Sequence, residues 1–128
     1  MVESPPTSPP LVLVIDDVED NRDLYEQFLR HEGWRVETAA DGEEGLAKAA
    51  TLGPSVVVLD LGLPRMDGWE VASRMKSAPG TSGVPVLALS GHVTPEARQR
   101  AKTAGVDEFI AKPCLPTDLV AAIRRHLK

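Results

Sequence analysis

Short apolar runs alternate with longer amphipathic stretches along most of the chain. Residues 11–15 form a continuous apolar run that ends in two acids. Such a run is typical of a strand that is buried on both faces of a parallel sheet. The same criteria predict four further strands, at residues 34–39, 55–59, 84–89 and 107–111.

Helical spacing of apolar residues fills the intervals between these strands. It predicts helices over residues 20–32, 43–52, 69–77, 95–104 and 116–127. The apolar faces expected to pack inward are Leu24, Phe28 and Leu29; Leu46, Ala49 and Ala50; Val71 and Met75; and Leu119, Val120, Ile123 and Leu127. Strands that alternate with helices predict an α/β fold, a doubly wound five-stranded parallel sheet with right-handed crossovers and five helices.

Composition narrows the class of protein. The chain has 128 residues, 42% of them hydrophobic, and a net charge of −5, as expected for one soluble globular domain. It has no Lys/Arg-rich stripe, which argues against direct nucleic-acid binding, and no apolar run long enough to span a membrane. The single cysteine, Cys114, excludes an internal disulfide, and the start of the chain lacks the features of a signal peptide, so we expect a cytoplasmic location.

Four of the eleven prolines lie in the first ten residues. We therefore expect residues 1–10 to form a flexible proline-rich tail and residues 11–128 to form the folded domain. A partner-binding proline-rich arm is the alternative, but no aromatic or basic anchor accompanies these prolines.

Chemically useful residues follow four of the five predicted strands. Asp16 and Asp17 follow the first strand, Asp60 the third, Ser90 the fourth and Lys112 the fifth. Ligands of open α/β sheets bind beyond the carboxyl ends of the strands, near the point where the strand order reverses. The second strand contributes no such residue, as expected if it lies at an edge in the order 2-1-3-4-5.

These side chains suggest a metal and a nucleophile. Two carboxylates about 5 Å apart repel each other by roughly 3 kcal/mol at an effective dielectric near 20, and a cation relieves that repulsion. Oxygen ligands without His or Cys favour Mg²⁺. Asp60 would then lie between this metal and Lys112, poised for in-line attack on phosphorus, and Ser90 would donate a hydrogen bond to a phosphoryl oxygen.

Several short motifs together resemble the receiver domain of response regulators in two-component signal transduction, the CheY-like family with a flavodoxin-like fold. The matching segments are Val14–Asp17, Leu59–Pro64, Met66–Gly68, Leu89–Gly91, Gly105–Phe109 and Ala111–Pro113. Each segment alone is weakly specific, but their order at successive strand ends is highly specific. The resemblance covers about Leu11 to Leu127.

The resemblance implies roles for residues at the matching positions. Asp60 would be the phosphoacceptor, and Asp17 would bind Mg²⁺ directly, with Asp16 acting partly through water. The backbone carbonyl of Gly62 would complete the protein ligands. Gly62 and His92 occupy two positions that vary within the family and tune the lifetime of the phosphoryl group.

Further roles follow from the same resemblance. Lys112 and Ser90 would hold the phosphoryl oxygens, and Phe109 would pack inward as a switch residue after phosphorylation. The Lys112–Pro113 peptide would be cis. Independently of the resemblance, Trp69 begins the helix after the Asp60 loop, close to the acidic crevice, and is therefore expected to report metal binding by fluorescence.

As a receiver, the chain would be a signalling protein and not an enzyme beyond its own phosphorylation and dephosphorylation. Its phosphoryl donor would be a sensor histidine kinase or a histidine phosphotransfer protein. The fourth helix, fifth strand and fifth helix would present an altered face to a downstream protein. A phosphorylation-dependent homodimer is a further expectation. A stand-alone regulator and a piece of a longer regulator or hybrid kinase both fit the sequence.

Three other functions compete with this interpretation. An aspartyl phosphatase would carry a second acid where this chain has Gly62. A flavodoxin-like cofactor binder would need a phosphate-binding first loop, but residues 16–20 are largely acidic. A pseudo-receiver that takes no phosphate would lack an acid or the lysine, and none is missing here.

Overall fold

The predicted apolar runs form five parallel strands in a computed structural model that describes residues 9–127. Their order is β2-β1-β3-β4-β5, as predicted. The bounds are β1 (Leu11–Ile15), β2 (Arg35–Ala39), β3 (Val56–Asp60), β4 (Val86–Ser90) and β5 (Glu108–Ala111). Compared with the prediction, β3 and β4 each extend one residue further, so that Asp60 and Ser90 end their strands.

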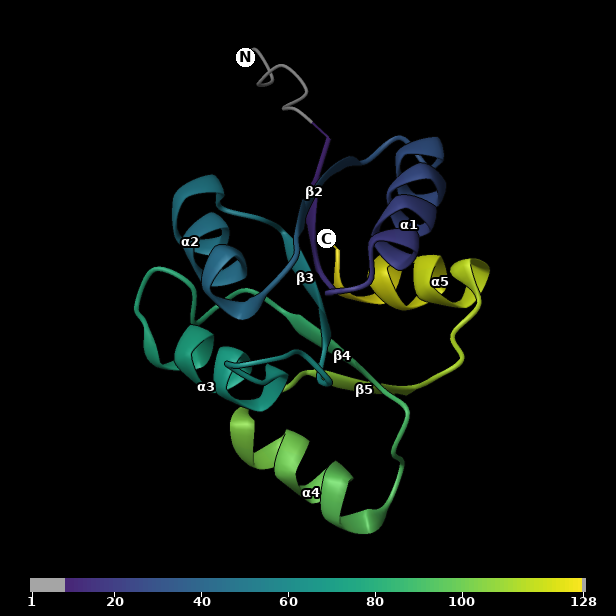
Figure 1. The fold of residues 1–128 in the computed structure, drawn as a ribbon. Helices are drawn as coiled ribbons and strands as arrows, with labels where there is room; N and C mark the ends of the chain where they lie inside the picture. Colours follow the sequence, from purple (N-terminus) through teal and green to yellow (C-terminus); the bar gives the residue numbers. More distant parts are fainter. Residues whose placement is uncertain (1–8, 128) are drawn as a thin grey trace.

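Five helices cover both faces of the sheet. They are α1 (Glu19–His31), α2 (Gly42–Leu52), α3 (Gly68–Ser77), α4 (Pro95–Ala104) and α5 (Pro116–His126). Helices α1 and α5 lie on one face, and α2, α3 and α4 lie on the other (Figure 1). Alternate residues of each buried strand therefore enter two separate hydrophobic cores, which is why these strands are apolar throughout.

The inward face of α1 differs from the prediction. Leu24 and Phe28 are 48% and 36% exposed, whereas Tyr25 and Leu29 are buried. Tyr25 and Leu29 are four residues apart on one side of the helix, and this side packs in the core shared with α5. Leu29 is therefore buried as predicted, but Leu24 and Phe28 were wrongly assigned to the inward face in place of Tyr25, because apolar residues lie on more than one side of the helix.

Helix α2 also packs differently from the prediction. Ala50 is exposed, and Gly45 faces the sheet together with Ala49. A Cβ on Gly45 would lie 2.5 Å from Cδ1 of Ile15, so the glycine allows a close approach of helix and strand. The predicted inward residues of α3 are buried, as are those of α5 except Leu127, which is partly buried against the core.

Two predicted features lie at the boundary of the described region. Of the predicted tail at residues 1–10, residues 1–8 lie outside the described residues, as does Lys128 at the other end of the chain. Pro9 and Pro10 accept hydrogen bonds from Arg35 through their carbonyl oxygens. Among residues 9–127, no helix is both long and apolar enough to cross a membrane.

Candidate functional site

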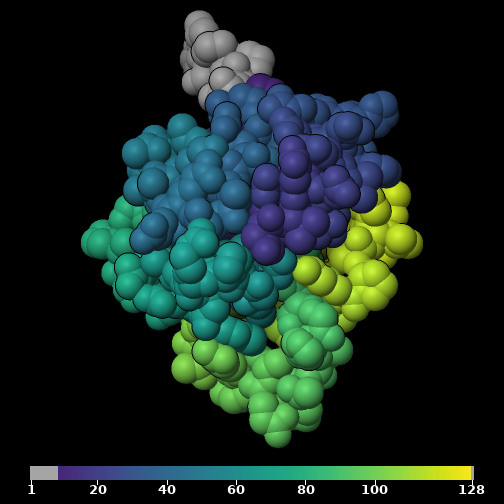
Figure 2. Space-filling view, viewed as in Figure 1, coloured from purple at the N-terminus to yellow at the C-terminus, as the bar shows by residue number. Residues whose placement is uncertain are grey.

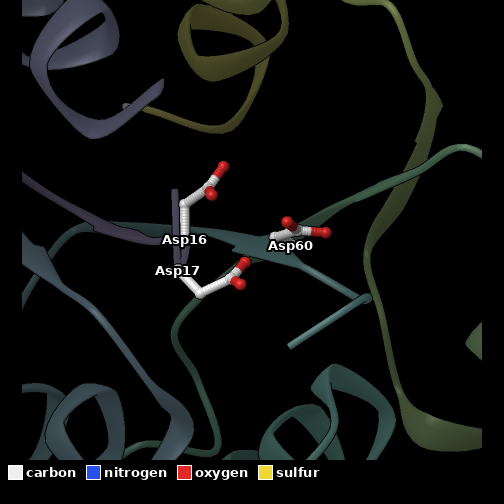
Figure 3. A group of neighbouring side chains, drawn as sticks. All are labelled: Asp16, Asp17 and Asp60. Carbon is white, nitrogen blue, oxygen red and sulfur yellow. The ribbon is translucent and has the colours of Figure 1, made fainter. Parts of the chain in front are cut away.

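Three aspartates meet at the carboxyl end of the sheet. Asp16 and Asp17 follow β1, and Asp60 ends the neighbouring strand β3 (Figure 3). The parallel register pairs Ile15 with Leu59, so the residues that follow them reach the same edge. Carboxylate oxygens of the three aspartates lie within 4.8 Å of one another.

An open pocket of about 400 Å³ lies at this edge. It is lined by Asp17, Val18, Asp60, Leu61, Gly62, Trp69, Ser90, Gly91, His92 and Lys112. The structure thus brings together most of the residues that the sequence suggested. Asp16 lies beside the pocket at 1% exposure, and Phe109 is not part of the pocket lining.

Asp60 is held through both of its carboxylate oxygens. The ammonium Nζ of Lys112 lies 3.1 Å from Oδ2, and the backbone N–H of Gly62 donates to Oδ1 over 2.9 Å. The Asp60 side chain is 7% exposed and that of Lys112 is 31% exposed. A lysine on the edge strand therefore does reach the central strand, as the sequence suggested, and Asp60 is fixed in orientation.

Asp16 is anchored by the first turn of α1. Its Oδ1 accepts from the Val18 backbone N–H at 2.9 Å, its Oδ2 accepts from Asn21 at 3.3 Å, and its carbonyl accepts from Arg22 at 2.8 Å. Sequence analysis missed Asn21 and Arg22, because their spacing of five and six residues from Asp16 has no meaning until the helix is placed.

The charge state of Asp16 reflects this crowding. Burial raises the pKa of Asp16, and the negative charge of Asp60 raises it further. The Val18 N–H and the positive charge of Lys112 act in the opposite direction but do not cancel the shift. The charged carboxylates of Asp16 and Asp60 therefore repel each other, and a bound cation would reduce this repulsion.

Ser90 is engaged with its own loop. Its hydroxyl donates to the carbonyl of His92 at 3.1 Å and accepts from the His92 backbone N–H at 3.0 Å. The residues after Ser90, from Gly91 to Thr94, are all exposed. Ser90 thus lines the pocket with its hydroxyl committed to the loop that leads into α4.

The loop after Asp60 returns tightly to the sheet before α3 begins. A Cβ on Gly68 would lie 2.5 Å from Cα of Leu61, so glycine is needed for this return. Asp67 caps α3 by accepting from the Glu70 backbone N–H at 2.9 Å. This return places Trp69, at the start of α3, in the wall of the pocket.

The donor set fits a hard divalent cation. It consists of three carboxylates, with no His or Cys ligand in the group. Oxygen ligands of this kind suit Mg²⁺, which commonly keeps several waters and binds one or two protein carboxylates together with phosphate oxygens. Because Asp17 is exposed and Asp60 opens to the same pocket, both can take part in such a shell.

Comparison with known proteins identifies a family. The sequence profile described as "Response regulator receiver domain" matches residues 12–124. Among curated proteins, the chain is 38% identical over 120 residues to the probable transcriptional regulatory protein TcrX of Mycobacterium tuberculosis, a match that covers 94% of this chain and 50% of TcrX. The chain is also 32% identical to protein PilG of Pseudomonas aeruginosa, over 91% of this chain and 86% of PilG.

Solved structures agree with this assignment. The chemotaxis protein CheY4 of Vibrio cholerae superposes with a TM-score of 0.88 at 33% identity, over 93% of this chain and 99% of CheY4. Unlike CheY4, TcrX is matched over only part of its length, because this chain spans about half of that relative. The strand order and the five helices are those of the CheY-like flavodoxin fold.

Proposed function

This chain belongs to the response regulator receiver family of two-component signalling, and on that premise we propose that it accepts a phosphoryl group on Asp60 in a Mg²⁺-dependent reaction. The observation that carries the proposal is the position of Asp60. Its carboxylate lies within 4.8 Å of carboxylate oxygens of Asp16 and Asp17, and 3.1 Å from the Lys112 ammonium. A carboxylate with cations on both sides is a nucleophile whose transition state is stabilised electrostatically.

The transfer step follows from this arrangement. One oxygen of the Asp60 carboxylate forms a bond to phosphorus while the phosphorus–nitrogen bond of a donor phosphohistidine breaks. The electron pair of the broken bond leaves with the imidazole, which takes up a proton. Lys112 and the Gly62 N–H orient Asp60 for this attack. Ser90 lines the same pocket and would donate to a phosphoryl oxygen once its hydroxyl leaves His92.

Asp17, Asp60 and the backbone carbonyl of Gly62 would hold Mg²⁺ directly, with Asp16 acting partly through water. When bound, the metal supplies positive charge to the transferring phosphoryl oxygens. Burial and, to a lesser degree, the negative charge of Asp60 raise the pKa of Asp16, so a cation bound beside the two carboxylates would favour the charged form of Asp16.

Phosphorylation would then change the α4-β5-α5 face. Ser90 would exchange its hydrogen bonds with His92 for one to the phosphoryl group, and Phe109 would move inward. To shift such an equilibrium from 1:99 to 99:1 requires about 5.5 kcal/mol of differential stabilisation. A few charge-assisted hydrogen bonds to phosphate are of this magnitude.

The partners follow from the family. We propose a sensor histidine kinase or a histidine phosphotransfer protein as donor, and a downstream protein that binds the α4-β5-α5 face. A phosphorylation-dependent homodimer is a further proposal. The receiver domain would comprise residues 11–128 and would act in the cytoplasm without direct contact with nucleic acid.

Intact mass after incubation with Mg²⁺ and acetyl phosphate tests the proposal. We expect a gain of one phosphoryl mass in the wild-type chain and none in Asp60→Asn or without metal. A wild-type chain that neither gains this mass nor binds beryllofluoride with Mg²⁺ would refute the proposal and favour a pure interaction module.

Trp69 offers an independent optical test of the metal site. Its side chain lines the pocket, so we expect Mg²⁺ to change its fluorescence. The chain contains one other tryptophan, Trp34, which packs against the opposite core and serves as the background signal in Trp69→Phe. A metal response that persists in Trp69→Phe would contradict this assignment.

A further inference from the structure

Helix α4 is the helix with the smallest buried face. Of its ten residues, all of them described, Ala101 is the one that is buried. The helix and the loop before it stand out at one end of the molecule (Figure 2). Other contacts must therefore contribute much of what holds α4 against the sheet and α3.

Two arginines of α4 supply such contacts by stacking on aromatic rings. The Arg98 guanidinium lies 5.3 Å from the centre of the Phe109 ring, and the Arg100 guanidinium lies 4.7 Å from the centre of a Trp69 ring. Cations placed over aromatic faces at these distances are attracted to the ring. Arg100 also lies 3.7 Å from the Asp67 carboxylate, so its stack has a second support.

The Arg98 stack bears directly on the proposed switch residue. Phe109 lies on the edge strand β5, where its register partner on β4 is the small residue Ala88. Its side chain packs against the core on the α3 and α4 side and remains partly exposed. Arg98 lies over this partly exposed ring, so inward movement of the ring would break the stack.

The same helix is linked to the phosphorylation site through the chain. Ser90 is separated from α4 by the exposed segment 91–94, and its hydroxyl binds the backbone of His92 within that segment. Movement of Ser90 toward Asp60 would displace this segment and the first turn of α4. Arg98 lies in that part of the helix, where its N–H donates to the carbonyl of Thr94.

We propose that Arg98 is a positioning residue for the phosphorylation switch, because its stack on Phe109 holds the ring in the partly exposed placement and thereby opposes the phosphorylated arrangement. The inference rests on the proposed function of Asp60. It adds a determinant of the resting equilibrium that lies on α4, outside the pocket.

Beryllofluoride with Mg²⁺, titrated by calorimetry, measures that equilibrium. Arg98→Met keeps an unbranched apolar stem but removes the cation, so a larger fraction of the protein should already have the binding-competent arrangement. We expect beryllofluoride to bind about two- to five-fold more tightly to Arg98→Met than to the wild type. Arg98→Lys should restore much of the wild-type affinity, and Lys102→Met, on the same helix, should leave it unchanged.

A double-mutant cycle separates positioning of Phe109 from a general loosening of α4. In the Phe109→Leu background the ring is absent, so Arg98→Met should cause no further change in affinity. The chain contains two phenylalanines, Phe28 and Phe109, which allows ¹⁹F NMR of fluorophenylalanine-labelled protein with simple assignment. Without ligand, Arg98→Met should move the Phe109 signal toward its beryllofluoride-bound position.

The outcomes distinguish this inference from the proposed function. If the wild-type chain fails to bind beryllofluoride, the proposed function and the inference both fail. If the wild type binds but Arg98→Met binds equally or more weakly, only the inference is overturned. If Arg98→Met increased the affinity for beryllofluoride equally in the Phe109→Leu background, the inference would also be overturned, because the effect would not depend on the ring.

Discussion

The pKa values of two carboxylates in this domain, Asp16 and Glu108, are shifted in opposite directions by their surroundings. At the end of the sheet, three aspartates share one lysine, and burial together with the charge of Asp60 raises the pKa of Asp16. Near α5, Glu108 is bound by Arg125 and His126. Burial opposes the charged form of Glu108, but these two partners outweigh it and lower the pKa of Glu108.

The difference separates a binding site from a structural contact. A carboxylate that is already hydrogen-bonded to neighbouring basic side chains stabilises the fold modestly. A carboxylate crowded by others stabilises the fold less, and it gains when a cation or a phosphoryl group with its metal arrives. The acidic cluster is therefore the part of the molecule where ligand binding has most to contribute.

Removal of the shared lysine should have the largest effect. Lys112→Met leaves Asp60 without its cation, and we expect the rate of phosphorylation by acetyl phosphate to fall by about 100-fold or more. The measurement is the time course of mass gain in the presence of Mg²⁺. Arg125→Met, which removes the cation paired with Glu108, is the matched control and should be phosphorylated at the wild-type rate. A similar loss of rate in both variants would remove the distinction between the clusters.

Magnesium should stabilise the domain through the acidic cluster alone. At 100 times its dissociation constant, a ligand that binds only the native state adds about 2.7 kcal/mol to the free energy of unfolding. Urea unfolding at constant ionic strength, with and without MgCl₂, measures this gain. We expect it in the wild type and in Glu108→Gln but not in Asp17→Asn, and its persistence in Asp17→Asn would exclude the proposed ligands.

Neutralisation of Asp16 should stabilise the protein in the absence of metal. Each carboxylate pair near 5 Å costs roughly 3 kcal/mol and Lys112 offsets part of it, so Asp16→Asn should gain about 1–2 kcal/mol at pH 7. Because the folded pKa is raised, the stability linked to Asp16 is fully present below its ordinary pKa of about 3.9 and is lost as pH rises through the folded value. The difference between the two proteins in urea unfolding should therefore grow from acid to neutral pH. If Asp16→Asn were less stable than the wild type at pH 7, the proposed repulsion among the aspartates would be contradicted.

The contribution of Glu108 to the free energy of unfolding should show the opposite pH dependence and should be smaller. Glu108→Gln should lose about 0.5 kcal/mol at pH 7, since the pair is partly exposed. The folded pKa is lowered here, so the stability is present above the ordinary pKa of about 4.3 and is lost as pH falls through the folded value. Unfolding curves of both proteins, measured from pH 7 to below the lowered folded pKa of Glu108, should converge in acid. A gap that widens in acid would reverse the assignment.

Much of this molecule follows from the order of residues alone. Continuous apolar runs and helical periodicity determine the five strands and five helices, because both faces of a parallel sheet are covered. An acid, a hydroxyl or a lysine that follows a strand then lies at the same edge of the sheet, because all parallel strands have their carboxyl ends there. This is why Asp16, Asp17, Asp60, Ser90 and Lys112 could be grouped before any coordinates were known.

Only the tertiary structure decided how individual side chains face one another. It turned Tyr25 rather than Leu24 toward the core, since apolar residues on two sides of a helix leave its rotation undetermined. It also brought Arg98 to Phe109. Such contacts join segments whose relative placement depends on packing of the whole core, so no local pattern in the sequence specifies them.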